Sequence, residues 1–264
     1  MIKLERLTRY FLPNTPNEVK ALDDLSLEVH EGDFITVIGS NGAGKSTLLK
    51  AIAGVVAVDE GRIEIDGRDV TRLPEHRRAG EIGRVDQDPM ASTASLLTVE
   101  ENLAMAEMRG RPRLLARAVT APRRARFRET LVEVKLGLED RLQVRVGTLS
   151  GGQRQALALV MATAARPKLL LLDEHTAALD PSTARTVMEI TNSLVTRHRL
   201  TTLMVTHNMD QAIRWGNRLI MMHRGRVVMD IAGQEKTRLT VPELIEKFGQ
   251  VSGSVFDDDR ALLA

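Results

Sequence analysis

The chain has 264 residues, of which 43% are hydrophobic and 27% charged, a composition typical of a globular protein with one large domain or two small ones. It contains no cysteine, which excludes a disulfide framework, a thiolate metal site and a cysteine nucleophile. The net charge is +2, but residues 109–128 hold eight arginines and no acid, so the remainder of the chain carries −6. The positive charge is therefore concentrated in one basic segment.

The N-terminal part of the chain predicts strands around one glycine-rich loop. Apolar and polar residues alternate over residues 25–29, as in a strand with one exposed face. Residues 34–38 form an apolar run typical of a buried strand. The glycine-rich loop follows, and then a helical pattern that ends at Gly54. Residues 62–65 favour one arm of a hairpin, and residues 82–85 another short strand.

The second half alternates strands and helices after a helical insertion. Residues 92–165 have a helical pattern, contain the basic segment and are expected to form an inserted helical subdomain. Beyond them, residues 169–172 are typical of a buried strand, residues 182–198 of a helix, and residues 202–206 and 219–222 of further strands. Strands separated by helices pair in parallel, so the predicted core is a doubly wound α/β fold.

The glycine-rich loop satisfies the phosphate-loop pattern of Gly, four residues, Gly-Lys-Ser. It follows an apolar strand and precedes a helix, which is the context that the motif requires. Its backbone N–H groups are expected to face the phosphate oxygens of ATP, while Lys45 neutralises the β and γ charge and Ser46 offers its hydroxyl to Mg²⁺. The predicted nucleotide-binding residues are Ser40, Asn41, Gly42, Ala43, Gly44, Lys45, Ser46 and Thr47.

Two carboxylates end the buried strand at residues 169–172, at the edge where open α/β sheets bind ligands. Asp173 is expected to hold Mg²⁺, directly or through water. Glu174 is expected to polarise the water that attacks the γ-phosphate. Together with the loop, this pair predicts phosphoryl transfer to water.

A second pair of glycines opens a helix after Leu149. Ser150 and Gln153 fit a helix capping box, with Ser150 as the N-cap. The glycines between them, Gly151 and Gly152, also leave bare N–H groups at a positive helix end, which makes a second phosphate site on the same chain. One chain cannot easily use both sites on one nucleotide, whereas two chains packed head to tail can.

In this order, the motifs resemble those of the nucleotide-binding subunit of ATP-binding-cassette (ABC) transporters. Residues 39–47 look like its Walker A loop, residues 149–153 its signature, residues 169–174 its Walker B strand and residues 178–180 its D-loop. The resemblance adds three residues: Gln87 as the Q-loop ligand of Mg²⁺, His207 as a catalytic γ-phosphate contact, and Phe11 as the ring stacked on adenine, with Tyr10 as the neighbouring candidate.

The resemblance also implies the organisation of the chain. Residues 1–249 are expected to form one P-loop NTPase of the ABC type, α/β in class, with an antiparallel β subdomain. Residues 1–91 and 166–249 would make its core and β subdomain, residues 92–165 the helical subdomain with the signature, and residues 250–264 a C-terminal tail.

The resemblance further implies an ATPase that works as a head-to-tail dimer, either a homodimer or a heterodimer with a paralogue. It would couple ATP hydrolysis to solute import through separate transmembrane permease subunits, and indirectly to a solute-binding protein, at the cytoplasmic face of the inner membrane. The chain itself is not expected to cross the membrane, since its longest weakly polar stretch, residues 156–165, is far shorter than the roughly 20 residues of a span. Its N-terminus also lacks the apolar stretch of a signal peptide.

Three positions depart from the usual family pattern. His175 stands where proline is usual, Ala178 replaces a frequent serine, and Asp86 precedes Gln87 where an apolar or aromatic residue is common. None of these changes removes a catalytic group. Residues 173–180 and 206–209 together resemble bacterial uptake systems assigned to amino acids, aromatic ones among them.

Several alternatives stay open. The chain could serve an ABC exporter, a soluble ABC ATPase acting on nucleic acid or ribosomes, or a regulatory module that binds ATP without turnover. The basic segment could be a solvated helical face, a contact with the anionic inner leaflet, or a nucleic-acid contact. Its single aromatic residue, Phe127, offers little base stacking, so nucleic acid is not an expected partner.

Overall fold

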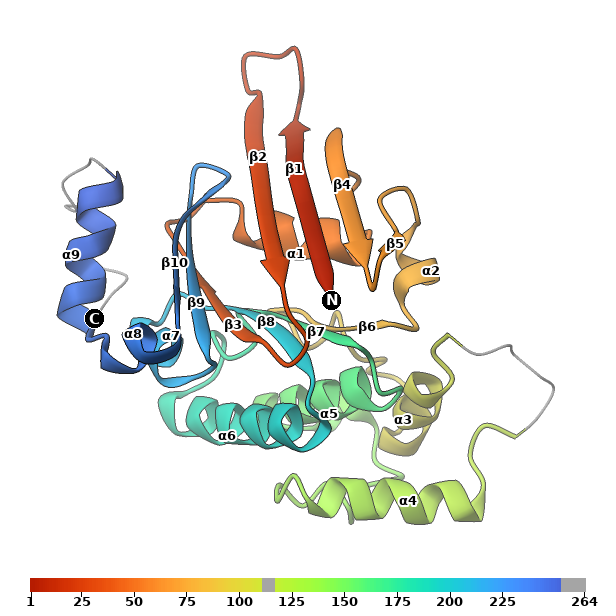
Figure 1. Cartoon of the computed structure of the whole chain (residues 1–264). Helices are drawn as coiled ribbons and strands as arrows, with labels where there is room; N and C mark the ends of the chain where they lie inside the picture. Colours follow the sequence, from red (N-terminus) through yellow and green to blue (C-terminus); the bar gives the residue numbers. More distant parts are fainter. Residues whose placement is uncertain (111–116, 253–264) are drawn as a thin grey trace. The chain divides into compact units, whose positions relative to one another are not determined.

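The computed structural model describes residues 1–110 and 117–252, which fall into two compact units (Figure 1). The first unit joins Met1–Arg78 to the described residues from Thr201 onward, and the second is Ala79–Leu200. This division differs from the predicted boundaries at 91/92 and 165/166. The second unit contains residues 92–165 and also the strands at residues 82–85 and 169–173 and the helix at residues 181–198.

An antiparallel sheet forms one part of the first unit. Its strand order is β2-β1-β4-β5, and each neighbouring pair is antiparallel. The strands are β1 (Ile2–Phe11), β2 (Val19–Val29), β4 (Glu60–Ile65) and β5 (Arg68–Asp69). Ile2, Leu4 and Leu7 of β1 are buried, while charged residues between them point to the other face. The predicted antiparallel β subdomain is confirmed.

A second set of strands in the same unit lies in the order β10-β9-β3-β8. They are β10 (Arg226–Ala232), β9 (Arg218–His223), β3 (Phe34–Ile38) and β8 (Thr201–Val205). Strand β3 pairs in parallel with both β8 and β9, and every residue of β3 and β8 is buried. Burial on both faces explains why residues 34–38 do not alternate between apolar and polar; the hydroxyl of Thr36, their one polar side chain, donates to the carbonyl of Ala212 at 2.9 Å.

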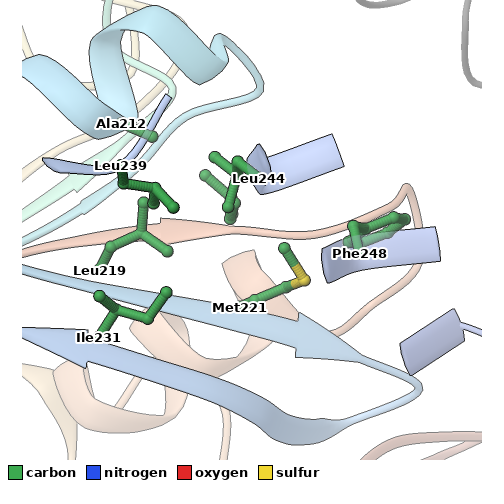
Figure 2. Close-up of a cluster of buried hydrophobic side chains, with 8 residues drawn as sticks. Ala212, Leu219, Met221, Ile231, Leu239, Leu244 and Phe248 are labelled. Carbon is green, nitrogen blue, oxygen red and sulfur yellow. The ribbon is translucent and has the colours of Figure 1, made fainter. Parts of the chain in front are cut away.

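Helices at the C-terminal end of the chain cover this sheet. They are α7 (Met209–Arg214), α8 (Gly233–Arg238) and α9 (Val241–Ser252). Figure 2 shows apolar side chains of α7, of α9 and of Leu239, which follows α8, against β9 and β10. The buried cluster consists of Ile38, Ala212, Leu219, Met221, Ile231, Leu239, Leu244 and Phe248. Helix α9 passes the predicted tail boundary at 249/250, and residues 253–264 of that tail lie outside the described residues.

The second unit combines a parallel strand pair with helices. Strands β6 (Ile82–Val85) and β7 (Leu169–Asp173) pair in parallel. The helices are α3 (Val99–Glu107), α4 (Ala121–Val132), α5 (Gly151–Thr163) and α6 (Pro181–His198), and α5 packs against α3, α6 and β6. No helix within residues 1–110 and 117–252 combines the length and the apolar character of a bilayer span.

The basic segment uses several of its arginines to join α4 to α3. Arg124 makes a bidentate ion pair with Glu100, at 2.5 and 2.9 Å. Arg126 and Arg123 both pair with Glu107, at 3.0 and 3.4 Å. None of the three sequence interpretations included this packing role. Residues 111–116 of the segment lie outside the described residues.

Candidate functional site

The glycine-rich loop in the first unit curls around the side chain of Lys45. Strand β3 leads directly into Gly39, and helix α1 (Lys45–Ala53) begins at the lysine. Lys45 is 6% exposed, and its Nζ donates to the carbonyl oxygens of Gly39 at 2.7 Å and of Ser40 at 3.0 Å. Ala43 N–H donates back to the carbonyl of Ser40 at 3.1 Å. A buried cation thus lies inside a tight backbone turn.

Glycines allow the loop to adopt this shape. Gly42 and Gly44 have φ angles of 77° and 97°, in the left-handed region that favours glycine. A Cβ on Gly44 would lie 2.2 Å from the carbonyl oxygen of Ala21 in β2, and a Cβ on Gly39 would lie 2.2 Å from that of Met222 in β9. The loop is therefore pressed against two strands, and no larger residue fits at either position.

The start of α1 fits a phosphate group. Its N-cap, Gly44, offers no side-chain hydrogen bond, and its first turn contains no acidic residue. A helix that begins in this way directs its first N–H groups and the positive end of its dipole toward an anion. The predicted nucleotide-binding residues lie in this turn or in the first turn of α1: Ser40, Asn41, Gly42, Ala43, Gly44, Lys45, Ser46 and Thr47.

His207 lies at the sheet edge from which the loop emerges. Strands β3 and β8 pair in parallel with Val37 opposite Val205, so Gly39 and His207 each follow that pair by two residues. His207 is exposed, and the next residue, Asn208, caps α7 through its side chain. The register thus brings the predicted γ-phosphate contact to the carboxyl edge that carries the phosphate loop.

Both aromatic candidates for adenine binding lie at the end of β1. Phe11 is 37% exposed, and the neighbouring strand β2 contributes the carbonyl of Ala21 that borders the phosphate loop. The guanidinium carbon of Arg9 lies 5.2 Å from the centroid of the Phe11 ring. The ammonium of Lys20 lies 5.5 Å from that of Tyr10. Each ring therefore makes a cation–π contact at the end of β1.

The ends of β6 and β7 carry the predicted groups of the second unit. These strands pair in parallel with Val85 opposite Leu172, so Gln87 and Glu174 occupy equivalent positions two residues further on. Asp173, which is 9% exposed, is the last residue of β7. One sheet edge thus carries an amide and two carboxylates, and their oxygens are of the kind that Mg²⁺ prefers.

Glu174 has a strained backbone next to a buried histidine. Its φ is 45°, a left-handed conformation that costs a residue with a side chain roughly 1–2 kcal/mol. His175 is 2% exposed, and its Nε2 lies 3.1 Å from the Thr191 hydroxyl on α6. Burial lowers the pKa of His175 to about 4, so the imidazole is neutral at pH 7.

The start of α5 is capped by side chains at Ser150 and Gln153. Ser150 Oγ accepts from the N–H of Gln153 at 3.3 Å, and Gln153 Oε1 accepts from the N–H of Ser150 at 3.3 Å. The predicted capping box is confirmed. Gly151 is exposed, whereas a Cβ on Gly152 would lie 2.3 Å from Cγ2 of Thr183. Gly152 thus has a packing role, and a second phosphate site here stays a prediction.

Asp180, in the D-loop, fixes the start of α6. Its Oδ1 accepts from the N–H groups of Ser182 and Thr183, both at 3.1 Å, and from the Ser182 hydroxyl at 2.6 Å. These hydrogen bonds hold the pKa of the Asp180 carboxyl well below its usual range. The carboxylate therefore caps the helix at neutral pH.

Two residues outside the predicted set support the phosphate loop and the far end of the helix that follows it. Gly225 donates its N–H to the carbonyl of Ala43 at 3.0 Å, from the turn between β9 and β10. Arg78 is buried and donates to two carbonyls in the last turn of α1, at 2.9 and 2.7 Å. The Arg224-Gly225 pair is a turn signal, but its contact with the loop depends on the sheet register.

Over most of its length the chain is similar to ATP-binding proteins of transporters. A family model described as "ABC transporter" matches residues 22–177. The tyrosine transport ATP-binding protein of Clostridioides difficile (strain R20291) is 44% identical over 250 residues, which cover 94% of this chain and 98% of that protein. The methionine import ATP-binding protein of Rhizobium etli is 39% identical over 211 residues, which cover 79% of this chain and 56% of that protein.

Solved structures give the same result for the fold. A dimeric ATP-binding cassette in a post-hydrolysis state, bound to ADP and Pi, matches with a TM-score of 0.74 and 29% identity, over 88% of this chain and 98% of that one. The ADP conformation of another ATP-binding cassette of an ABC transporter matches with a TM-score of 0.78 and 26% identity, over 97% and 99% of the two chains.

Proposed function

The chain belongs to the ABC transporter family as an ATP-binding and ATP-hydrolysing subunit, and from this premise we propose that it drives solute import through separate permease subunits. The proposed solutes are amino acids, aromatic ones among them. Support for this class comes from the tyrosine transport relative, which aligns with nearly the whole chain, and from the methionine import relative.

The observation that carries the ATPase assignment is the geometry of the phosphate loop. The start of α1 has no side-chain cap, and the ammonium of Lys45 is buried inside the loop before it. Both features favour the polyphosphate of a nucleotide over a neutral ligand. The exposed ring of Phe11, on the strand next to the one that borders this loop, supports adenine as the base.

The proposed catalytic roles follow from the residues at the two strand edges. Glu174 polarises the attacking water, His207 contacts the γ-phosphate, and Lys45 neutralises the charge that develops on the phosphates. Ser46, Gln87 and Asp173 are the proposed oxygen donors for Mg²⁺, which would supply further neutralisation of the phosphate charge.

We further propose that two chains form a head-to-tail dimer, either with a second copy or with a paralogue. Ser150, Gly151, Gly152 and Gln153 of one chain would then contact the ATP bound at Lys45 of the other. Only the closed dimer offers both phosphate sites to one ATP, so ATP binding favours closure. After hydrolysis this preference is lost and the dimer can open. The similar cassette that is dimeric and bound to ADP and Pi supports the formation of a dimer.

The proposed coupling passes through residues 92–165 and Gln87. Residues 92–165 act as the helical subdomain, and residues 1–91 and 166–249 as the core that binds ATP. Gln87 follows β6 near the border between these segments. A change in the bound nucleotide would be transmitted there from the core to the helical subdomain. The chain would work at the cytoplasmic face of the inner membrane, held there by the permease and linked only indirectly to a solute-binding protein.

The test is purification from native membranes in mild detergent, with identification of the proteins that co-elute. ATP turnover is then measured for the wild type, for Glu174→Gln and for Glu189→Gln, an exposed carboxylate on α6 that serves as the control. Glu174→Gln should lower kcat by about 10²–10⁴-fold and keep ATP binding, because the general base is lost while the phosphate loop is intact. Glu189→Gln should turn over like the wild type.

The solute class is tested with the same complex in liposomes. ATP-dependent accumulation of labelled tyrosine that disappears in Glu174→Gln would support the proposal. Movement of solute in the opposite direction would make the chain an exporter subunit. A partner-free, soluble ATPase would contradict a transport role, and wild-type turnover in Glu174→Gln would remove Glu174 from catalysis.

A further inference from the structure

His175 joins the turn that carries Glu174 to the middle of helix α6. Its Nε2 lies 3.1 Å from Oγ1 of Thr191, and the two residues are 2% and 0% exposed. The Thr191 hydroxyl also donates to the carbonyl of Val187, one turn earlier in α6, at 2.8 Å. Because a hydroxyl has a single proton, His175 is the donor in the first hydrogen bond, and its Nε2 carries the hydrogen.

This hydrogen bond ends on a helix that is itself firmly held. Helix α6 begins at the Asp180 cap, and its buried face, which includes Val187 and Thr191, packs within the second unit against α5. A buried donor without an acceptor is costly, so His175 is tied to this helix position. The residue immediately before it, Glu174, is restrained by the same contact.

Glu174 has a backbone conformation that requires such a restraint. Its φ of 45° persists only when the surrounding structure fixes it. The N–H of Ala177 donates to the carbonyl of Glu174 at 3.0 Å and closes the turn on one side. A proline in place of His175 would restrict the chain through its ring. In this protein the restriction comes from a side-chain hydrogen bond.

We propose that His175 is a positioning residue for ATP hydrolysis, which holds Glu174 in its working orientation through the hydrogen bond to Thr191. The inference rests on the proposed role of Glu174 as the group that polarises the attacking water. The imidazole is buried and acts through Glu174. Loss of this bond should therefore slow the chemical step and leave ATP binding intact, because small misplacements of a catalytic group are costly.

The experiment compares variants of the full chain in steady-state ATPase assays with separate kcat and KM, alongside ATP affinity and thermal unfolding. Thr191→Val removes the hydroxyl and keeps the side-chain shape, and His175→Phe removes the donor and keeps a ring. Both should lower kcat by about tenfold at unchanged KM. Thr191→Ser and His175→Gln keep an acceptor and a donor, and should retain most of the turnover. Thr196→Val, at an exposed site on α6, is the control.

The Glu174→Gln background separates positioning from general damage to the fold. There, Thr191→Val should cause no further loss, because the group that it positions is already inactive. Wild-type kcat in Thr191→Val and His175→Phe, or an additional loss in the Glu174→Gln background, would overturn the proposal. Unchanged turnover in Glu174→Gln alone would instead overturn the proposed function. If Thr191→Val does not fold, the kcat values of His175→Phe and His175→Gln are compared instead. The proposal then requires a lower kcat in His175→Phe than in His175→Gln.

Discussion

Two helix starts in this molecule are predicted to contact phosphate, and they are built in opposite ways. Helix α1, in the first unit, begins with the buried Lys45, and the glycine before it offers no side-chain cap. Helix α5, in the second unit, begins with a complete capping box between Ser150 and Gln153. The first is arranged for an anion in advance. In the second, the helix's own side chains accept from the N–H groups of Ser150 and Gln153, and this capping box does not use those of Gly151 and Gly152 between them.

This difference predicts a division of labour between the two helix starts. A single chain should owe its affinity for ATP to the start of α1 alone. The start of α5 should contribute only when a second chain presents its bound nucleotide, because in the proposed head-to-tail dimer its glycines contact the ATP of the other chain. Variants at the two sites should therefore differ in whether they weaken binding to the isolated chain.

Lys45→Ala should have the largest effect on the first site. Its ammonium is the buried cation of the loop, and hydrogen bonds to a charged group contribute about 1.5–3 kcal/mol, so the Kd for ATP should rise about 10- to 100-fold. Lys50→Ala, on the exposed side of the same helix, is the matched control and should bind normally. Titration of ATP at protein concentrations too low for dimers checks this. Equal weakening by Ser150→Ala under these conditions would contradict the division of labour.

Acid should lower the stability of the second unit, because its residue His175 is buried and neutral. The folded-state pKa of His175 is about 4 and the unfolded value is near 6.5, so its contribution is complete above pH 6.5 and is lost as the pH falls toward 4. The loss should be on the order of a few kcal/mol, since one pKa unit corresponds to about 1.4 kcal/mol. Urea unfolding between about pH 7 and pH 4, with His175→Gln as a variant that does not titrate, measures it. A wild-type to variant difference that does not change with pH would contradict this assignment.

The local parts of both helix starts could be predicted from the sequence. The buried strand before the loop, the helix after it and its end at Gly54, which has a left-handed φ of 78°, are all confirmed. The capping box of α5 is confirmed as well. Each of these features depends on residues a few positions apart, whose spacing determines the structure almost alone.

The supports around these sites could not be predicted, because they join distant parts of the chain. Gly225 reaches the loop at Ala43 only through the pairing of β9 with β3. The bond between His175 and Thr191 requires the packing of α6 beneath the end of β7. The pairing of Arg124 with Glu100 likewise shows that the charge of a segment does not indicate its partners.

Gly152→Ala tests whether the start of α5 needs its glycine for packing or for phosphate. The new Cβ would lie 2.3 Å from Cγ2 of Thr183, and such overpacking costs about 1–3 kcal/mol. Thr183→Ser removes that methyl group, so the double variant should regain the wild-type Tm. Gly151→Ala, whose Cβ would lie 3.3 Å from its nearest neighbour, is the control for stability.

Turnover of the same double variant then separates the two roles of the glycine. If the bare backbone of Gly152 contacts phosphate in the dimer, kcat should stay low although Tm is restored. Recovery of both Tm and kcat would mean that packing alone requires the glycine, and the second phosphate site would lose its main support.

Ser150→Ala should have the smallest effect, because it only makes the start of α5 resemble that of α1. Loss of an N-cap costs about 1 kcal/mol, which corresponds to about 2–4 °C in Tm for a chain of this size. The two bonds of the capping box are both 3.3 Å long, so the cost should not exceed that value. Calorimetry against Ser193→Ala, an exposed serine within α6, gives the measurement. No change in Tm would mean that the capping box contributes nothing to the stability of α5.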